Sequence, residues 1–370
     1  MRETKGVVIT GKNQVAIQEH LPLPEKPNAL GAIIRPSVWS ICTSDTELYK
    51  TGCERLPYMV NRLAIGHEMC GVVEEVGEDV KDFKPGDRVV VCTKMPNWRS
   101  LEAQDGYYRG NADNYFWGDP GPDRGGSFVE HYYMRDADMN LAHIPDGVSM
   151  EQAVVITDMM GTSYGGVEDC LNIRFGDTVA VIGVGPVGLM AVSAAVNRGA
   201  GRVFAVGSRK VCEEAALDLG ATHFFSYRDE NYLDNMIIAN DGKPVDAVIV
   251  CGGYSDELNK GLRILKRGGT LLNLTKFADE SVYTMDLSVI SHGTGGKNIH
   301  TASCAGGRVF LTRMLNMIQA GRVKPERIIT HRFEGIEKIP EAMQLYVNLD
   351  RSLIKAVVFN ENRLDKEYTD

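Results

Sequence analysis

The sequence predicts an α/β fold of two domains, one rich in β-strands and one built on a doubly wound parallel sheet. From residue 177 onward, short apolar strands alternate with helical segments, as in a parallel sheet that helices cover on both faces. A glycine-rich turn at 183–188 follows the first of these strands and opens a helix. Before residue 160, short β-branched runs alternate with turn residues, which is typical of a β-rich domain.

The β-rich part contains strand-like runs at residues 30–35, 71–76 and 88–92. A turn with proline and glycine, 82–87, precedes the last of these strands. Residues 96–126 are irregular and rich in Gly, Asp, Asn and aromatic residues. Because a loop of this length is uncommon in a compact domain, we expect it to be functional or fixed by packing.

Strands and helices alternate in the parallel-sheet part of the chain. The expected order is strand 177–182, helix 189–197, strand 202–206, helix 212–219, strand 247–251, helix 258–265 and strand 270–274. The strands are largely apolar, which indicates that both faces of the sheet are buried. Beyond residue 306, we expect a helix at 309–318 and an apolar strand at 353–359.

Composition excludes several classes of function. The 370 residues carry a net charge of −9, which argues against nucleic acid or an anionic membrane as the main partner. No apolar stretch is long enough to span a bilayer, and the N-terminus lacks a signal pattern, so a cytoplasmic location is expected. The eight cysteines include no C-x-x-C pair, so we expect no four-thiolate zinc site.

The turn Gly183-Val184-Gly185-Pro186-Val187-Gly188 matches the G-x-G-x-x-G fingerprint of dinucleotide-binding proteins. The first glycine makes the tight turn, the second lets the backbone approach the pyrophosphate, and the third allows close packing of helix and strand. The N–H groups at the start of the helix suit the phosphate charge. Since strand, turn and helix occur in the required order, this segment predicts a dinucleotide site.

The end of the next strand indicates which dinucleotide binds. About 20 residues past the glycines, an acidic residue would bind the ribose 2′-hydroxyl of NAD. Here the strand ends in Gly207, Ser208 and Arg209. A serine hydroxyl and a guanidinium suit a 2′-phosphate, and no carboxylate repels it. The cofactor is therefore expected to be NADP; the alternative is that Arg209 is only a solvated residue at a helix start.

A metal site is suggested by Cys42 in Cys-Thr-Ser-Asp and by His67 and Glu68 in Gly-His-Glu. Zn²⁺ prefers cysteine thiolate and histidine nitrogen, with a carboxylate as a possible further ligand. Taken alone, a cysteine and a histidine so far apart in the sequence are more often core residues.

Longer segments add to this evidence. They are 42–45, 66–68, 83–91, 136–143, 158–160, 185–192 and 206–209. These segments resemble the zinc-containing medium-chain dehydrogenases, in particular the bacterial NADP-dependent secondary alcohol dehydrogenases. The resemblance implies a GroES-like catalytic domain at 1–160 and 304–370, a Rossmann NADP-binding domain at 161–303, and a homotetramer or homodimer.

The resemblance also implies roles for individual residues. In the family, one catalytic zinc is held by residues that match Cys42, His67 and Asp158. The residue that matches Glu68 approaches the metal, either as an exchanging ligand or just behind the ligands. Ser44 matches the serine that takes the substrate proton. Tyr227 falls where a tyrosine assists in binding the 2′-phosphate, together with Gly207, Ser208 and Arg209. The implied reaction is hydride transfer between NADP(H) and a secondary alcohol or ketone.

Several positions depart from the family pattern. Glu47 stands where many relatives have a proton-relaying histidine, and it is either a relay residue or an exposed helix charge. Around the implied substrate pocket, polar or different residues occur at Thr93, Trp117, Lys276, Ser303 and Cys304. A polyol, amino alcohol or hydroxysteroid-like substrate is therefore an alternative. An inactive cofactor-binding protein is a remote alternative, because Cys42, His67, Asp158 and Ser44 are all present.

Overall fold

The structure, a computed structural model, describes residues 2–54, 57–106, 125–277 and 282–364. The chain forms two compact units. The first comprises Met1–Asp158, Gly306–Gly321 and Ile329–Asp370, and the second comprises Met159–Ala305 and Arg322–Ile328. The mixed α/β fold predicted from the sequence is confirmed.

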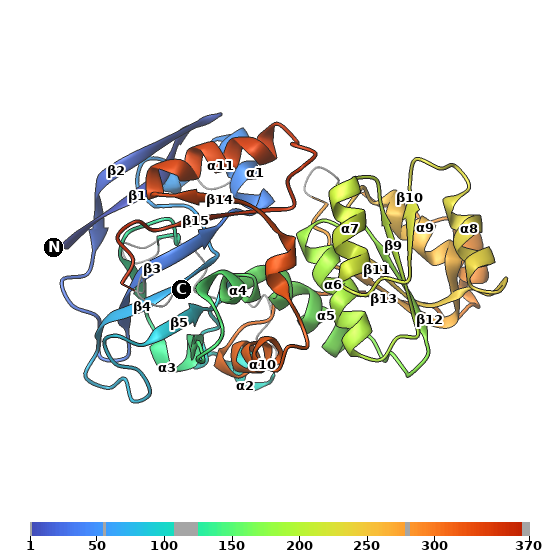
Figure 1. Ribbon diagram of the computed structural model, residues 1–370, viewed down its shortest axis with the longest axis horizontal. Coiled ribbons are helices and arrows are strands. Elements are labelled where there is room, and N and C mark those ends of the chain that lie inside the picture. The colour runs from blue at the N-terminus through green and yellow to red at the C-terminus, as the bar shows by residue number, and fades with distance from the viewer. Residues whose placement is uncertain (1, 55–56, 107–124, 278–281, 365–370) are drawn as a thin grey trace. The chain divides into compact units, whose positions relative to one another are not determined.

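Strands dominate the first unit (Figure 1). A hairpin of β1 (Arg2–Gly11) and β2 (Gln14–Leu23) accompanies a larger sheet. That sheet runs in the order β14 (Ile329–Glu334), β15 (Lys355–Phe359), β3 (Ala32–Ser40), β4 (Met69–Val76), β5 (Arg88–Val91) and β7 (Leu141–His143), with β6 (Tyr132–Met134) paired to β3. The central strands β3 and β4 are antiparallel neighbours, so the end of β3 lies beside the start of β4.

Short helices surround this sheet. They are α1 (Thr43–Thr51), η1 (Pro57–Met59), α2 (Leu101–Gln104), α3 (Ala137–Asn140), α4 (Met150–Val154), η2 (Ile156–Met160), α10 (Arg308–Gln319), η5 (Ile336–Lys338) and α11 (Ile339–Val347). Helix α1 packs against α11, as Figure 1 shows, and α4 packs against β3 and β4. The η2 segment follows α4 and is a π-helical turn.

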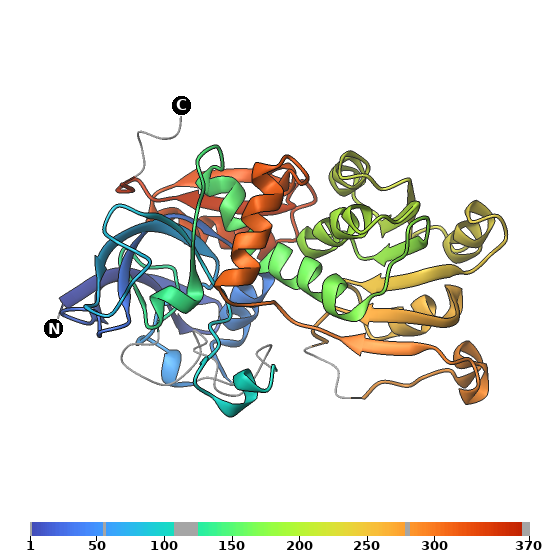
Figure 2. The same cartoon turned by 90° about the horizontal axis from the view of Figure 1, so that it is seen from below.

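The second unit is a parallel sheet in the order β10 (His223–Ser226), β9 (Arg202–Gly207), β8 (Thr178–Ile182), β11 (Val245–Val250), β12 (Leu265–Asn273) and β13 (Asn298–Thr301). Strand β13, orange in Figure 2, is an edge strand. This order is that of a doubly wound dinucleotide-binding sheet, in which ligands bind at the carboxyl ends of the strands.

Helices cover both faces of this sheet (Figure 1). On one face lie α5 (Gly161–Cys170), α6 (Pro186–Asn197) and α7 (Lys210–Asp218), and on the other α8 (Tyr232–Ala239) and α9 (Asp256–Ile264). The 3₁₀ segments η3 (Leu287–Gly293) and η4 (Pro325–Ile328) complete the unit. Strand residues such as Phe204, Val248 and Leu271 are fully buried, which explains the apolar strand pattern. In the described part of the chain, no helix is both long and apolar enough to cross a membrane.

Candidate metal centre and cofactor site

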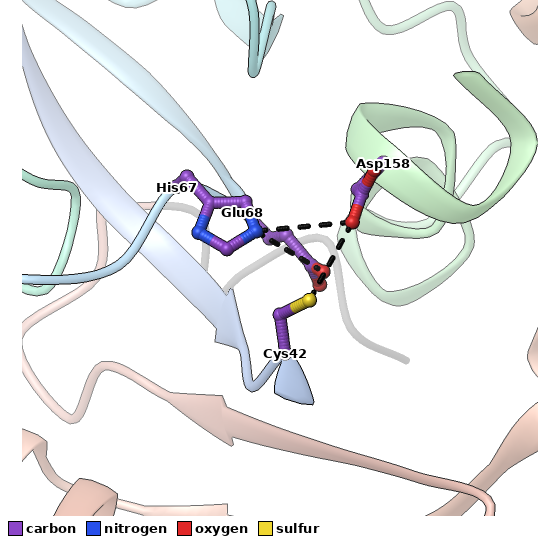
Figure 3. Close-up of side chains that lie close together, drawn as sticks. All are labelled: Cys42, His67, Glu68 and Asp158. Atoms are coloured by element: carbon purple, nitrogen blue, oxygen red, sulfur yellow. Dashed lines mark hydrogen bonds and ion pairs between the residues drawn. The ribbon is translucent and has the colours of Figure 1, made fainter. Parts of the chain in front are cut away.

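Four side chains that can bind a metal converge in the first unit: those of Cys42, His67, Glu68 and Asp158 (Figure 3). One ligand atom of each lies within 4.8 Å of the others. Asp158 Oδ2 is 3.6 Å from Cys42 Sγ and 3.8 Å from His67 Nε2. Because the ligand atoms of a tetrahedral zinc ion lie about 3.3–3.8 Å apart, these three residues fit a catalytic zinc with one open position.

The β-sheet places the first of these ligands. Cys42 lies between the end of β3 and the start of α1, in an extended conformation at the helix N-cap. His67 and Glu68 directly precede β4, and the N–H of Ser40 in β3 donates to the carbonyl of Glu68 at 3.1 Å. Asp158 comes from the π-helical turn η2. Such turns are rare and frequently occur at functional sites.

Asp45 is fully buried behind two of the ligands. Its Oδ2 accepts a hydrogen bond of 2.9 Å from the N–H of Cys42, and its Oδ1 lies 3.3 Å from His67 Nδ1. A carboxylate at one ring nitrogen orients a histidine so that the other nitrogen faces the metal. Burial lowers the pKa of His67, but the carboxylates of Asp45 and Asp158 outweigh it and raise that pKa well above its usual range.

Lys355 of β15 forms a buried ion pair with Glu68. Its Nζ lies 2.9 Å from Glu68 Oε1 and 2.8 Å from Oε2, and both side chains are at most 2% exposed. Burial lowers the pKa of Lys355, but the Glu68 carboxylate outweighs it and raises that pKa above its usual range. Glu68 Oε1 also lies 3.9 Å from His67 Nε2, so Glu68 is beside the metal position while its charge is matched by the lysine.

Sequence reasoning missed both Asp45 and Lys355. Asp45 stands three residues after the N-cap position of α1, a spacing at which an acidic side chain bonds back to the N-cap backbone. Lys355 is the one charged residue in the predicted apolar strand 353–359. A lysine in such a run is rarely buried unless it is paired.

Three further predicted residues of the first unit can be located in the structure. Ser44 and Glu47 are half-buried on α1, one helical turn apart. Thr93 is buried, and its hydroxyl donates to the carbonyl of His67 at 2.8 Å, so it holds the ligand-bearing backbone. Trp117 lies outside the described residues.

Three predicted pocket residues belong to the second unit. Lys276 is exposed in the segment after β12, Ser303 is half-buried after β13, and Cys304 next to it is buried. The Cys304 Sγ lies 3.2 Å from the carbonyl oxygen of Ala305. Their grouping with Thr93 in one substrate pocket stays a prediction.

The glycine-rich turn has the geometry that a dinucleotide needs. Gly183 has a φ of +90°, which a side chain rarely adopts, and a Cβ on Gly188 would lie 2.0 Å from the Gly183 carbonyl oxygen. These two glycines are therefore required by the fold. A Cβ on Gly185, by contrast, would meet no atom within 4 Å. Since Gly185 caps α6, which begins at Pro186, the open space lies at a helix N-terminus and fits a pyrophosphate.

Residues from two neighbouring strands meet where the 2′-phosphate is expected. Strand β9 ends at Gly207, and the N–H of Tyr227 after β10 donates to the Gly207 carbonyl at 3.1 Å. The Ser208 hydroxyl donates to the Tyr227 oxygen at 2.7 Å. Arg209 follows as the N-cap residue of α7. The structure thus brings the serine, the arginine and the tyrosine to one strand edge, and residues 207–209 contain no carboxylate.

Comparisons with known proteins give consistent results. A family model described as alcohol dehydrogenase GroES-like domain matches residues 28–146, and one described as zinc-binding dehydrogenase matches 186–318. The NADP-dependent isopropanol dehydrogenase of Thermoanaerobacter brockii is 41% identical over 334 residues, covering 90% of this chain and 93% of that protein. Sorbitol dehydrogenase of Bacillus subtilis is 32% identical over 357 residues, covering 96% and 97%. Alcohol dehydrogenase TADH from Thermus sp. ATN1 has a TM-score of 0.85 at 26% identity, covering 96% and 100%.

Proposed function

Because the chain belongs to the zinc-binding dehydrogenases with a GroES-like alcohol dehydrogenase domain, we propose that its substrate is a small secondary alcohol or the matching ketone. The chain is a zinc-dependent, NADP-linked alcohol oxidoreductase. The convergence of Cys42, His67 and Asp158 carries this conclusion. The isopropanol dehydrogenase supports a secondary alcohol, and the polyol alternative is not favoured because the sorbitol dehydrogenase is less similar.

Different residues of the site have different proposed roles in the reaction. A zinc ion supplies Lewis acidity toward an alcohol or carbonyl oxygen, and NADP⁺ supplies the hydride acceptor. The Cys42 thiolate and the Asp158 carboxylate bring two negative charges. These balance the positive charge of a zinc ion and make it a weaker Lewis acid. We propose that Ser44, two residues after Cys42, accepts the proton of the substrate hydroxyl. Glu47 lies three residues further on the same helical face and is proposed to pass that proton on.

We also propose that the enzyme works in the cytoplasm as a homotetramer or homodimer. None of the eight cysteines forms a disulfide in the structure, which fits a reducing compartment. The oligomeric state follows from the resemblance to the secondary alcohol dehydrogenases.

A panel of ketones and secondary alcohols tests the function. Purified protein is expected to reduce small methyl ketones with NADPH, with a higher kcat/KM than for polyols and with a lower kcat/KM when NADH replaces NADPH. Steady-state kinetics with both cofactors measures this. A preference for polyols would refute the substrate, and a preference for NADH would refute the 2′-phosphate site.

Replacing Arg209 with alanine is expected to raise the KM for NADP about 10–100-fold, because charge-assisted hydrogen bonds to the 2′-phosphate are lost. The KM for NAD should change little, since NAD has no phosphate at that position. Steady-state kinetics with each cofactor measures the difference. Lys210→Ala is the control, because Lys210 is the neighbouring cation but is exposed and pairs with Glu213. An equal rise in the KM for NADP and for NAD would show that Arg209 does not bind the 2′-phosphate.

A further inference from the structure

Three Phe, Tyr or Trp side chains are exposed among the described residues: Phe175, Tyr227 and Tyr254. Tyr227 belongs to the 2′-phosphate site described above. Tyr254 is 78% exposed and lies between β11 and α9, directly after Gly252 and Gly253. It is thus at the carboxyl edge of the parallel sheet, whereas Phe175 precedes β8 and lies at the amino edge.

Tyr254 borders a surface at the strand ends that glycine backbone forms in part. Strand β8 is followed by Gly183, and β11 is followed by Cys251 and Gly252. At the end of β9, the Val184 side chain lies against Gly207. A Cβ on Gly183 would lie 2.8 Å from the N of Gly252, so the ends of β8 and β11 nearly touch. A Cβ on Gly252 would meet nothing nearer than 3.7 Å. A flat group can therefore lie against the backbone at the ends of β8 and β11.

Arg209 and Tyr254 flank this surface on opposite sides. Arg209 follows β9, the neighbour of β8 on one side, and Tyr254 follows β11, the neighbour on the other. The 2′-phosphate end of the cofactor is expected at Ser208 and Arg209, and the adenosine that carries this phosphate must lie nearby. The planar group that comes with it is adenine.

We propose that the ring of Tyr254 stacks on the adenine of NADP and forms the second wall of the adenosine subsite. The proposal rests on the NADP site proposed above. Stacking suits this position because every base offers a π-face, and because a bound adenine removes from water an aromatic ring that is otherwise mostly exposed. Unlike the residues near Arg209, Tyr254 contributes to binding whether or not the 2′-phosphate is present.

The test measures binding of NADP⁺, NAD⁺ and adenosine 2′,5′-bisphosphate to the full-length protein by titration calorimetry. Tyr254→Ala is expected to weaken all three about 10-fold, the range found when a stacking aromatic is removed. Tyr254→Phe should bind within about twofold of the unmodified protein, since the ring is kept. Phe175→Ala is the control, because it removes another exposed aromatic ring, at the opposite edge of the sheet.

Each outcome decides between distinct explanations. If Tyr254→Ala binds the three ligands as tightly as the unmodified protein does, the proposed stacking is wrong. An equal loss in Tyr254→Phe and Tyr254→Ala overturns it as well, because the hydroxyl would then be the group that binds. If the unmodified protein fails to bind the bisphosphate, the proposed NADP site itself is wrong. A decrease in ultraviolet absorbance of the bound bisphosphate, absent with Tyr254→Ala, would support stacking directly.

Discussion

Replacing Cys42 with alanine is expected to abolish zinc binding and to lower kcat/KM with NADP(H) by more than 100-fold. The Cys42 thiolate lies 3.6 Å from Asp158 Oδ2, which in turn lies 3.8 Å from His67 Nε2. Without the thiolate, the two remaining ligands cannot hold a catalytic zinc ion tightly. Mutating a residue that only supports a metal ligand already lowers metal affinity or activity about 10–100-fold. Loss of a direct ligand must therefore lower them more. Elemental analysis of metal content and steady-state kinetics on the same sample measure both effects.

The control for this variant is Cys170→Ala. Cys170 is a half-buried thiol at the end of α5, outside the group of ligands, so its loss removes a thiol without removing a ligand. We expect this control to keep its zinc and its activity. A Cys42→Ala protein that retains one zinc per chain and near-normal turnover would show that the metal lies elsewhere. Asp158→Ala should behave like Cys42→Ala, because Asp158 Oδ2 and Cys42 Sγ, 3.6 Å apart, belong to the same group of ligands.

The parallel sheet could be predicted from the sequence because its evidence is local. Apolar strands, helices and the glycine turn follow one another within about 100 residues, and burial on both faces leaves nearly continuous apolar runs. Strand β13 could not be predicted in this way. All four residues of Asn298–Thr301 are exposed at the sheet edge, so no burial pattern marks them.

The metal centre could not be predicted from local sequence patterns, because its residues lie far apart in the chain. Cys42 and Asp158 are 116 positions apart, and nothing in that spacing places them 3.6 Å from each other. The resemblance implies their pairing, and the fold supplies the physical reason. Strands β3 and β4 meet where α4 packs, and the π-helical turn that carries Asp158 follows α4. The separation is larger for the ion pair of Lys355 and Glu68, which are 287 positions apart in the sequence.

Thr93 shows how a role can change once contacts are known. From the sequence, a polar residue at this position suggests a more polar substrate pocket. In the structure its hydroxyl donates to the carbonyl of His67, and the residue is only 5% exposed. The threonine therefore stabilises the loop that carries a ligand, and the polarity it adds does not by itself argue for a polar substrate.

Replacing Lys355 with methionine is expected to lower the free energy of unfolding of the zinc-free protein by about 3–5 kcal/mol, because Glu68 is left as a buried charge without its partner. Urea denaturation after chelation measures this. Lys338→Met is the control: it breaks the exposed pair with Glu341 and should cost less than about 1 kcal/mol. The double variant Lys355→Met, Glu68→Met should recover most of the loss, since an apolar pair of similar volume replaces the ion pair.

The metal gives this experiment a second readout. Glu68 Oε1 lies 3.9 Å from His67 Nε2, so a zinc ion at the centre is a nearby positive charge that can partly replace the lysine. The loss caused by Lys355→Met should therefore be smaller in the zinc-loaded protein than after chelation. An equal loss in both states would mean that Glu68 does not interact with the metal. A loss no larger than that of Lys338→Met would contradict the buried ion pair itself.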